Sequence, residues 1–183
     1  MKLLDICDIS GKSVKKFCGQ KKYIATGDVI DNSIFQYTVV TYDNKPSRAN
    51  IEISENEILF AKMLNTKKVL IADKDNINNI YSTGFCCLKP KENVNNEYLY
   101  YFLNSESFNK QKDKNCSGAT QKAITNEGLG KIIINSIPTI NEQIKIVSKL
   151  KKIDCLISNK IKQINKLNEL IKSQFVEEDV YAV

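Results

Sequence analysis

The chain has 183 residues, of which 42% are hydrophobic, and a formal net charge of +6. This length suffices for one domain with a buried core, and no apolar run approaches the ~18 residues of a membrane-spanning helix. Because the chain has no histidine, histidine-based acid–base catalysis is excluded and a zinc site would need thiolate ligands alone. The positive charge favours a polyanionic partner such as nucleic acid.

The first half of the chain is expected to be mainly β. A short helical turn over Leu3–Asp8 precedes a polar, basic loop over Ser10–Lys22. β-Branched and aromatic residues then recur in short runs, separated by turn-forming pairs such as Gly27-Asp28 and Asp43-Asn44. The predicted strands are Tyr23–Thr26, Ile34–Tyr42, Asn50–Ile53, Ile58–Met63, Lys68–Ala72 and Ser82–Leu88.

From Asn96 the pattern becomes helical. Apolar residues recur at spacings of three and four, which predicts a helix of about 13 residues whose aromatic side chains belong to the core. These residues are Tyr98, Leu99, Phe102, Leu103 and Phe108. A polar segment, Lys110–Asn126, follows, and a last strand is predicted over Ile132–Ile137.

The terminal segment, from about Gln143 to Phe175, carries a heptad pattern. Aliphatic residues recur at every seventh position and at a second seam position, and Phe175 widens the stripe. The predicted seam is Ile146, Leu150, Ile153, Ile157, Ile161, Ile164, Leu167 and Ile171. A helix capped by Asn141 would run roughly 50 Å at ~1.5 Å per residue, which favours pairing with a partner helix. The alternative is an amphipathic helix folded over its own domain.

Two segments are candidates for binding nucleic acid. Lys110–Asn126 combines lysines with small hydroxyl and amide side chains beside glycine, which lets backbone amides approach a phosphate, although a solvated loop would have the same composition. The loop Asp43–Arg48 holds the only arginine of the chain. The guanidinium fork suits a guanine edge or a phosphate, but an exposed surface arginine is an equally good interpretation.

No enzymatic constellation is apparent. Gly128-Leu129-Gly130 is not a dinucleotide or phosphate loop, and the chain has neither a glycine motif for a methyl donor nor an Asn-Pro-Pro-aromatic motif for methylating a base. Asp73 and Asp75 could hold Mg²⁺, but a hairpin turn explains them better. The six cysteines lack a framework spacing. We therefore predict a non-catalytic chain without a metal or cofactor, with reduced cysteines, located in the cytoplasm and not on a membrane.

Several segments together resemble the specificity subunits of type I restriction-modification enzymes. In chain order they are Tyr23–Asp28, Pro46–Ala49, Glu57–Met63, Ser82–Phe85, Tyr100–Leu103, Ser117–Ile124, Ile137-Pro138, Glu142-Gln143 and the helical run from Lys149. Each segment is short, but their order and spacing cover nearly the whole chain. The resemblance implies an α+β fold, with a mainly β target recognition domain over residues 1–138 and a long coiled-coil helix over 139–183.

The resemblance also implies a function. In that family the globular domain reads about half of a bipartite double-stranded DNA sequence, and the helix sets the distance between two such domains. A modification subunit docks on the helices and methylates adenine, and a restriction subunit uses ATP to move DNA. S-adenosylmethionine, ATP and Mg²⁺ are thus expected on partner subunits and not on this chain.

Typical members carry two recognition domains and two helices, whereas this sequence has one of each. We therefore expect an antiparallel homodimer whose target is a split inverted repeat. The candidate DNA contacts are Lys45, Ser47, Arg48 and Lys62 in the first half and Lys114, Ser117, Thr120, Gln121 and Lys122 in the second. The main alternative is a β-rich adaptor that does not bind DNA and recruits proteins through its helix. A magnesium-dependent nuclease ranks third.

Overall fold

The computed structural model describes the backbone of residues 1–180 and the side chains of residues 1–174. The chain forms two compact units, Met1–Ile144 and Lys145–Val183. The side chain of Phe175, which widens the predicted stripe, and residues 181–183 of the predicted helical domain lie outside the described part of the chain.

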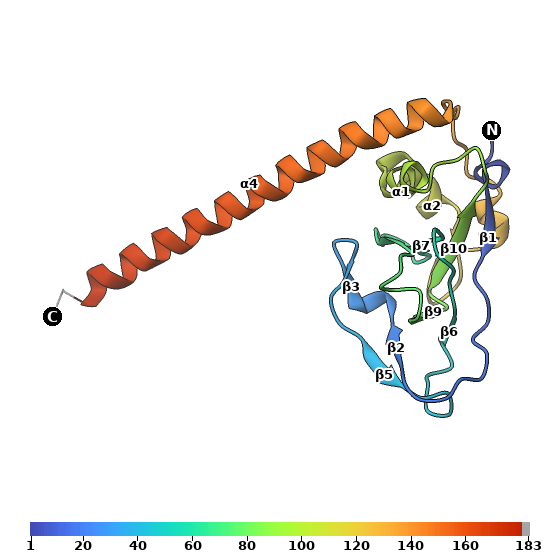
Figure 1. Ribbon diagram of the computed structural model, residues 1–183, viewed down its shortest axis with the longest axis horizontal. Coiled ribbons are helices and arrows are strands. Elements are labelled where there is room, and N and C mark those ends of the chain that lie inside the picture. Colours follow the sequence, from blue (N-terminus) through green and yellow to red (C-terminus); the bar gives the residue numbers. More distant parts are fainter. Residues whose placement is uncertain (181–183) are drawn as a thin grey trace. The chain divides into compact units, whose positions relative to one another are not determined.

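The first unit contains two four-stranded sheets (Figure 1). The first sheet is antiparallel and consists, in order, of β1 (Cys7–Ser10), β10 (Phe85–Pro90), β7 (Ile58–Ala61) and β8 (Val69–Ile71). The second consists, in order, of β5 (Thr38–Val40), β2 (Lys21–Ile24), β9 (Ile80–Ser82) and β6 (Ala49–Ile51), with β2 and β9 parallel. Two hairpins pair β3 (Val29–Ile30) with β4 (Ser33–Ile34) and β11 (Cys116–Ser117) with β12 (Ala123–Ile124).

The described helices are short, apart from the last. They are the 3₁₀ turns η1 (Leu3–Asp5) and η2 (Thr26–Asp28), followed by α1 (Asn96–Asn104), α2 (Glu106–Lys114), α3 (Asn126–Leu129) and α4 (Ile140–Val180). The predicted α+β class, mainly β with short helices and then one long helix, is confirmed. Within the described part of the chain, no helix has the length and apolar composition needed to cross a bilayer.

The first sheet is the middle layer of the globular unit, because its alternate residues enter different cores. Ile58 and Phe60 of β7 pack with the helices α1 and α2. The rings of Phe60 and Phe108 meet edge-on, with their centroids 5.2 Å apart. Leu59 and Ala61 face the second sheet. A strand buried on both faces has a continuous apolar sequence instead of an alternating one, as β7 does. Cys86 and Cys87 likewise enter opposite cores.

The sequence predicts one helix of about 13 residues from Asn96, but the structure has two helices there, α1 and α2. Ser105 has extended backbone angles (φ −69°, ψ 152°), and its hydroxyl accepts the backbone N–H of Phe108 at 3.2 Å. The serine therefore ends α1 and caps α2, which is the usual role of a serine at a helix start. The predicted polar segment Lys110–Asn126 consequently begins inside α2.

Three strand predictions were also wrong. The predicted strand Ile34–Tyr42 is divided into β4 (Ser33–Ile34) and β5 (Thr38–Val40), which belong to different sheets. Ile132–Ile137 forms only an isolated bridge, between Lys2 and Ile133. The predicted strand Ser82–Leu88 is divided at Thr83-Gly84 into β9 and β10, which belong to different sheets. β1 forms over the last two residues of the expected helical turn, Cys7 and Asp8, and ends at Ser10, where the expected loop begins.

The long helix begins at Ile140, two residues earlier than a cap at Asn141 would place its start. The Glu142 carboxylate accepts both the N–H and the hydroxyl of Thr139 at 2.8 Å, so Thr139, and not Asn141, occupies the position before the helix. Gln143 is fully buried and makes hydrogen bonds with Asn95 N (2.8 Å), Asn93 O (3.0 Å) and Pro138 O (2.9 Å). Its side chain thus attaches the first turn of α4 to the start of α1 within the first unit.

Candidate nucleic-acid interface

Backbone hydrogen bonds bring the two predicted DNA-binding segments together. The N–H of Thr83 donates to the carbonyl of Arg48, and the N–H of Lys62 donates to the carbonyl of Gly84, each at 2.9 Å. The N–H of Ile124 in turn donates to the carbonyl of Lys62 at 2.9 Å. We call this series of contacts, which links Arg48, Thr83-Gly84, Lys62 and Ile124, the backbone ladder.

The hairpin β11–β12 lies at one end of the ladder, and a tight turn shapes its tip. Gly118 has φ +129°, and a Cβ there would lie 2.5 Å from the carbonyl oxygen of Gln121, so only glycine fits this turn. The N–H of Leu64 donates to the carbonyl of Lys122 at 2.9 Å, which fixes the hairpin beside the end of β7. The exposed candidates on the hairpin are Ser117, Thr120, Gln121 and Lys122.

Most of the candidate basic side chains are free to meet a ligand. Among the described residues, the side chains of Arg48, Lys62, Lys114 and Lys122 have no hydrogen-bond or ion-pair partner. Lys45 differs, because its ammonium donates to the carbonyl of Ala49 at 2.9 Å and lies 5.6 Å from the centre of the Tyr42 ring. Ser47, beside Arg48, is exposed.

Lys112 shows that not every lysine of the segment after α1 faces solvent. Its side chain is fully buried, and its ammonium donates to the carbonyls of Met63 (2.9 Å) and Thr66 (2.7 Å) and lies 3.2 Å from the Asp113 carboxylate. A buried ammonium is tolerated when its donors are satisfied in this way. Lys112 therefore holds the turn after Lys62 in place.

Sequence reasoning missed a second set of polar residues beside the ladder. Ser10, Lys12 and Thr83 line a pocket of about 250 Å³ together with Lys62. The first two lie in the segment that was expected to be a plain loop, and only the pairing of β1 with β10 brings them near Lys62. No local pattern in the sequence signals that proximity.

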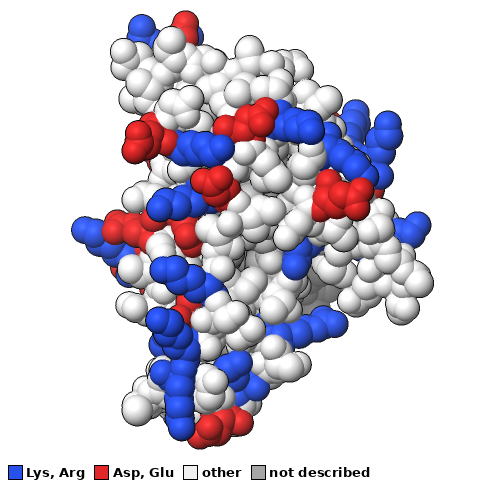
Figure 2. All heavy atoms as spheres, turned by 90° about the vertical axis from the view of Figure 1, so that its right-hand side faces the viewer, with Lys and Arg blue, Asp and Glu red and all other residues white. Residues whose placement is uncertain are grey.

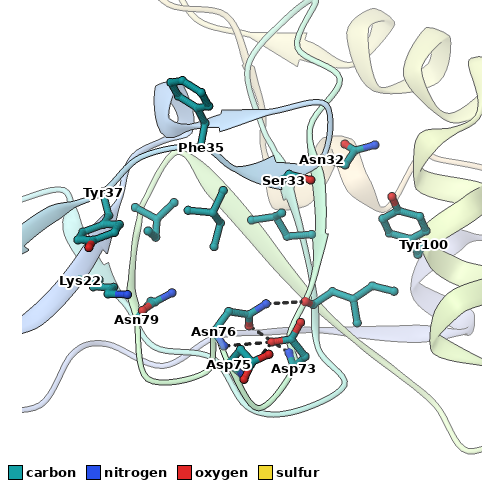
Figure 3. A pocket seen from close by; sticks show the side chains of 14 residues that line it. Lys22, Asn32, Ser33, Phe35, Tyr37, Asp73, Asp75, Asn76, Asn79 and Tyr100 are labelled. Carbon is teal, nitrogen blue, oxygen red and sulfur yellow. Dashed lines mark hydrogen bonds between the residues drawn. The ribbon is translucent and has the colours of Figure 1, made fainter. Parts of the chain in front are cut away.

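A larger pocket, of about 570 Å³, has a different lining (Figure 3). Phe35 and Tyr37 lie on one side of it and the turn from Asp73 to Asn76 on the other, and the Lys22 ammonium lies 4.4 Å from the centre of the Tyr37 ring. None of the candidate DNA contacts lines this pocket.

The acidic pair at this pocket does not form a metal site. Asp73 Oδ1 accepts the N–H groups of Asp75 and Asn76, both at 3.0 Å, as expected of a turn. That turn joins β8 and β9 of different sheets and so does not close the expected hairpin. Within the described residues, no cluster of three His, Cys, Asp or Glu side chains is placed to hold a metal ion.

Charge is unevenly distributed on the face shown in Figure 2. Basic side chains predominate over the lower part of that face, and acidic and basic side chains are mixed over the upper part. Such a one-sided distribution is compatible with a polyanionic ligand.

The side chains of the predicted seam are largely uncovered. Ile153, Ile157, Ile161, Ile164, Leu167 and Ile171 are each at least half exposed, whereas Ile146 and Leu150 are partly buried. Leu156 and Leu170, which the prediction omitted, are also exposed and flank the seam. The apolar stripe is therefore wider than a strict two-position heptad seam.

Comparisons with known proteins agree on one family. The chain is 29% identical over 167 residues to the specificity subunit of the type I restriction enzyme HindI from Haemophilus influenzae, covering 86% of this chain and 36% of that protein. Its fold matches the HsdS subunit from Thermoanaerobacter tengcongensis, with a TM-score of 0.72, 20% identity, and coverage of 87% of this chain and 42% of that one.

A second structure gives the same result. It comes from work on complex assembly and conformational transition of the type I R-M system, and it matches with a TM-score of 0.71, 20% identity and coverage of 91% and 43%. The chain thus spans less than half the length of these relatives. The family model for the type I restriction modification DNA specificity domain matches residues 1–169. The chain therefore belongs to the type I restriction modification DNA specificity domain family.

Proposed function

We propose that this chain reads one half of a bipartite double-stranded DNA target in a type I restriction-modification system. The first unit would contact the DNA, and the helix would set the distance to a second recognition unit. The observation that carries this proposal is the backbone ladder, because it brings Arg48, Lys62 and the β11–β12 hairpin to neighbouring positions with their basic side chains unpaired.

The candidate contacts differ in the role that the structure favours. Lysines without an internal partner, such as Lys62, Lys114 and Lys122, suit phosphate groups, and they would position the domain without reading sequence. Arg48 and Gln121 carry the two side chains able to make paired hydrogen bonds to a guanine or an adenine edge. Lys45 is the weakest candidate, since its ammonium already has an internal acceptor.

We further propose that two copies pair through α4. The exposed aliphatic stripe is costly in water, and burying one such side chain contributes about 1.5–3 kcal/mol. Antiparallel pairing of two seams would cover it and place two recognition units about a two-fold axis. The target would then be an inverted repeat split by a spacer.

The remaining width of the stripe suits further protein partners. Leu156 and Leu170 lie beside the seam and are exposed, so one partner helix would leave part of the apolar surface uncovered. We propose that a modification subunit docks there, with a restriction subunit joining the complex. S-adenosylmethionine, ATP and Mg²⁺ would be bound by those subunits.

A salt titration on defined DNA tests the proposal. Methylation patterns in host DNA, compared with and without this gene, would give the target. The chain, with and without its modification subunit, is then titrated against that duplex and against a duplex with one half scrambled. The logarithm of the affinity should fall linearly with the logarithm of the salt concentration, and the scrambled duplex should bind more weakly. Weak, salt-independent binding to both duplexes would favour the protein-recruiting adaptor.

A further inference from the structure

A pocket beside the backbone ladder has the lining of an anion site. It has a volume of about 250 Å³, several times the ~30 Å³ that one water occupies in the liquid. Five separate segments form it: the end of β1 with the loop after it, β6, the residue after β7, the turn between β9 and β10 with the start of β10, and Asn126 at the start of α3. A site assembled from separate segments is held by the fold and not by one loop alone.

The charge of the pocket is entirely positive. Lys12 and Lys62 are the only charged residues in its lining, and no carboxylate contributes to it. Within the described residues neither ammonium has a hydrogen-bond or ion-pair partner. The two thiols of the wall, Cys86 and Cys87, remain neutral near pH 7, because burial raises the pKa of both, that of Cys86 to about 12.

One hydroxyl of the lining lacks a partner. Ser10 Oγ is buried and makes no hydrogen bond to another protein group, and it is the one described side-chain N or O atom in that condition. Buried polar groups are normally paired, so an unpaired one calls for a missing ligand or water. The Ser10 hydroxyl could donate a hydrogen bond to an oxygen of a bound anion.

The loop that carries Ser10 and Lys12 is fixed in advance. Gly11 has φ +91°, and a Cβ there would lie 3.1 Å from Cys87 Sγ and 3.3 Å from Ile51 Cγ2, so glycine lets the loop lie close against the wall. The N–H of Lys12 donates to the carbonyl of Glu52 at 2.9 Å, and the N–H of Glu52 donates back at 2.8 Å. A preorganised loop loses little entropy when a ligand binds.

We propose that this pocket binds one phosphate group of the DNA backbone, with Lys12 and Lys62 supplying charge and the Ser10 and Thr83 hydroxyls donating hydrogen bonds. The assignment rests on the proposed function, since it presumes that the first unit binds DNA. DNA is favoured over free phosphate because Thr83 and Asn50 of the lining both donate their N–H groups to the carbonyl of Arg48. The pocket therefore lies beside the backbone of Arg48, the candidate base-reading residue.

The test compares Lys12→Gln with Lys16→Gln in the full chain. Both lysines are exposed and lie on the same loop, but only Lys12 lines the pocket. We expect Lys12→Gln to weaken binding to matched and scrambled duplexes alike and to reduce the slope of log affinity against log salt by about 1. Lys16→Gln should leave both quantities unchanged, and thermal melting should be the same for both variants.

Methylphosphonate substitution locates the phosphate. Neutral methylphosphonates placed one at a time along the target should include one position where wild-type binding weakens and where Lys12→Gln binding does not weaken further. Ser10→Ala should also weaken DNA binding, and the methylphosphonate at this position should weaken the binding of this variant no further. If wild type binds DNA but Lys12→Gln keeps the full affinity and slope, the pocket assignment is wrong and the proposed function stands. If wild type binds no DNA, the proposed function itself fails.

A measurement with inorganic phosphate distinguishes the two anions that the pocket could bind, a phosphate of the DNA backbone and free phosphate. Thermal melting is measured in inorganic phosphate and in chloride at equal ionic strength, for wild type and Lys12→Gln. Equal melting of both proteins in the two salts agrees with a site that needs the DNA backbone. Stabilisation of wild type alone by phosphate, combined with unchanged DNA affinity of Lys12→Gln, would assign the pocket to a free phosphate and overturn the proposal.

Discussion

The carbonyl oxygen of Lys62 accepts the backbone N–H of Ile124 at 2.9 Å. With the bond from the N–H of Leu64 to the carbonyl of Lys122, this contact joins the end of a core strand to the β11–β12 hairpin, and Met63 and Ala123 form a bridge between the two bonds. The hairpin is thus anchored at its base to a rigid strand, while residues 117–122 at its tip remain exposed. Changes at the tip should therefore affect ligand binding more than folding.

Gly118→Ala tests whether the tip of the hairpin acts in ligand binding more than in folding. A Cβ at this position would lie 2.5 Å from the carbonyl oxygen of Gln121, so the tip must adopt another conformation. We expect a loss of DNA affinity of about tenfold or more, on the scale of the 1–3 kcal/mol that a strained backbone position costs. Gly19→Ala is the control, because Gly19 also has a positive φ (+79°) but its Cβ would meet nothing within 4 Å. Equal DNA affinity of the two variants, measured by fluorescence anisotropy, would refute a role for the tip.

Substitutions at Arg48 and Lys45 should affect different properties, DNA affinity for Arg48 and the free energy of unfolding for Lys45. Arg48→Ala removes a side chain without an internal partner, so it should weaken DNA binding by about 1–3 kcal/mol and leave thermal unfolding unchanged. Lys45→Ala removes the hydrogen bond to the carbonyl of Ala49, so it should lower the free energy of unfolding by about 0.5–1.5 kcal/mol with little effect on DNA binding. Anisotropy titrations and urea unfolding of both variants give the comparison. The reverse pattern would remove Arg48 from the interface.

Thiol labelling should divide the cysteines by burial. Cys18 and Cys155 are exposed and should react rapidly with iodoacetamide at pH 8. Burial raises the pKa of Cys7 and of Cys86 to about 12, so these thiols carry almost no thiolate at pH 8 and should react only after unfolding. Mass spectrometry of the native and the urea-unfolded chain measures the difference. Rapid native labelling of Cys86 would contradict the two-sided burial of β10.

Sequence periodicity predicted the fold class and the long helix, because both depend on the local spacing of apolar residues. It failed where long-range contacts decide the outcome. Ile132 and Ile134 have the composition of a strand, yet their backbone groups pair with the first residues of the chain and extend no sheet. Ser105 breaks a continuous helical pattern because its hydroxyl caps a second helix.

In the candidate site too, the sequence predicted what depends on local chemistry and missed what depends on long-range contacts. Arg48 and the hairpin lysines could be selected by side-chain chemistry, and the family assignment supports the prediction of a non-catalytic chain. Local chemistry could not show that Lys112 is fully buried or that Lys45 has an internal acceptor. Ser10 and Lys12 were missed since their position depends on the pairing of β1 with β10.

Gln143→Glu should strongly destabilise the first unit. The buried Gln143 amide donates to the carbonyls of Asn93 and Pro138, and a carboxylate would place an oxygen against those carbonyls and bury a charge. Loss of these bonds costs on the order of 1–3 kcal/mol, and the unpaired charge adds to it. The matched control is Asn141→Asp, the same chemical change at an exposed position in the first turn of the helix, where a negative charge is favourable. Thermal melts that agree within error for the two variants would contradict the role assigned to Gln143.

The exposed stripe of α4 predicts self-association that two charges should abolish. Ile157 and Ile164 are each more than half exposed and occupy the same seam position one heptad apart. Placing Asp at both should give monomers on sedimentation velocity, because pairing would bury unpaired carboxylates. Ser158→Asp with Asn165→Asp adds the same charge one residue later, off the seam, and should leave the dimer intact. A wild-type chain that sediments as a monomer at about 50 µM, well above the dissociation constant expected for a seam of several buried aliphatic pairs, would rule out pairing of two copies through this helix.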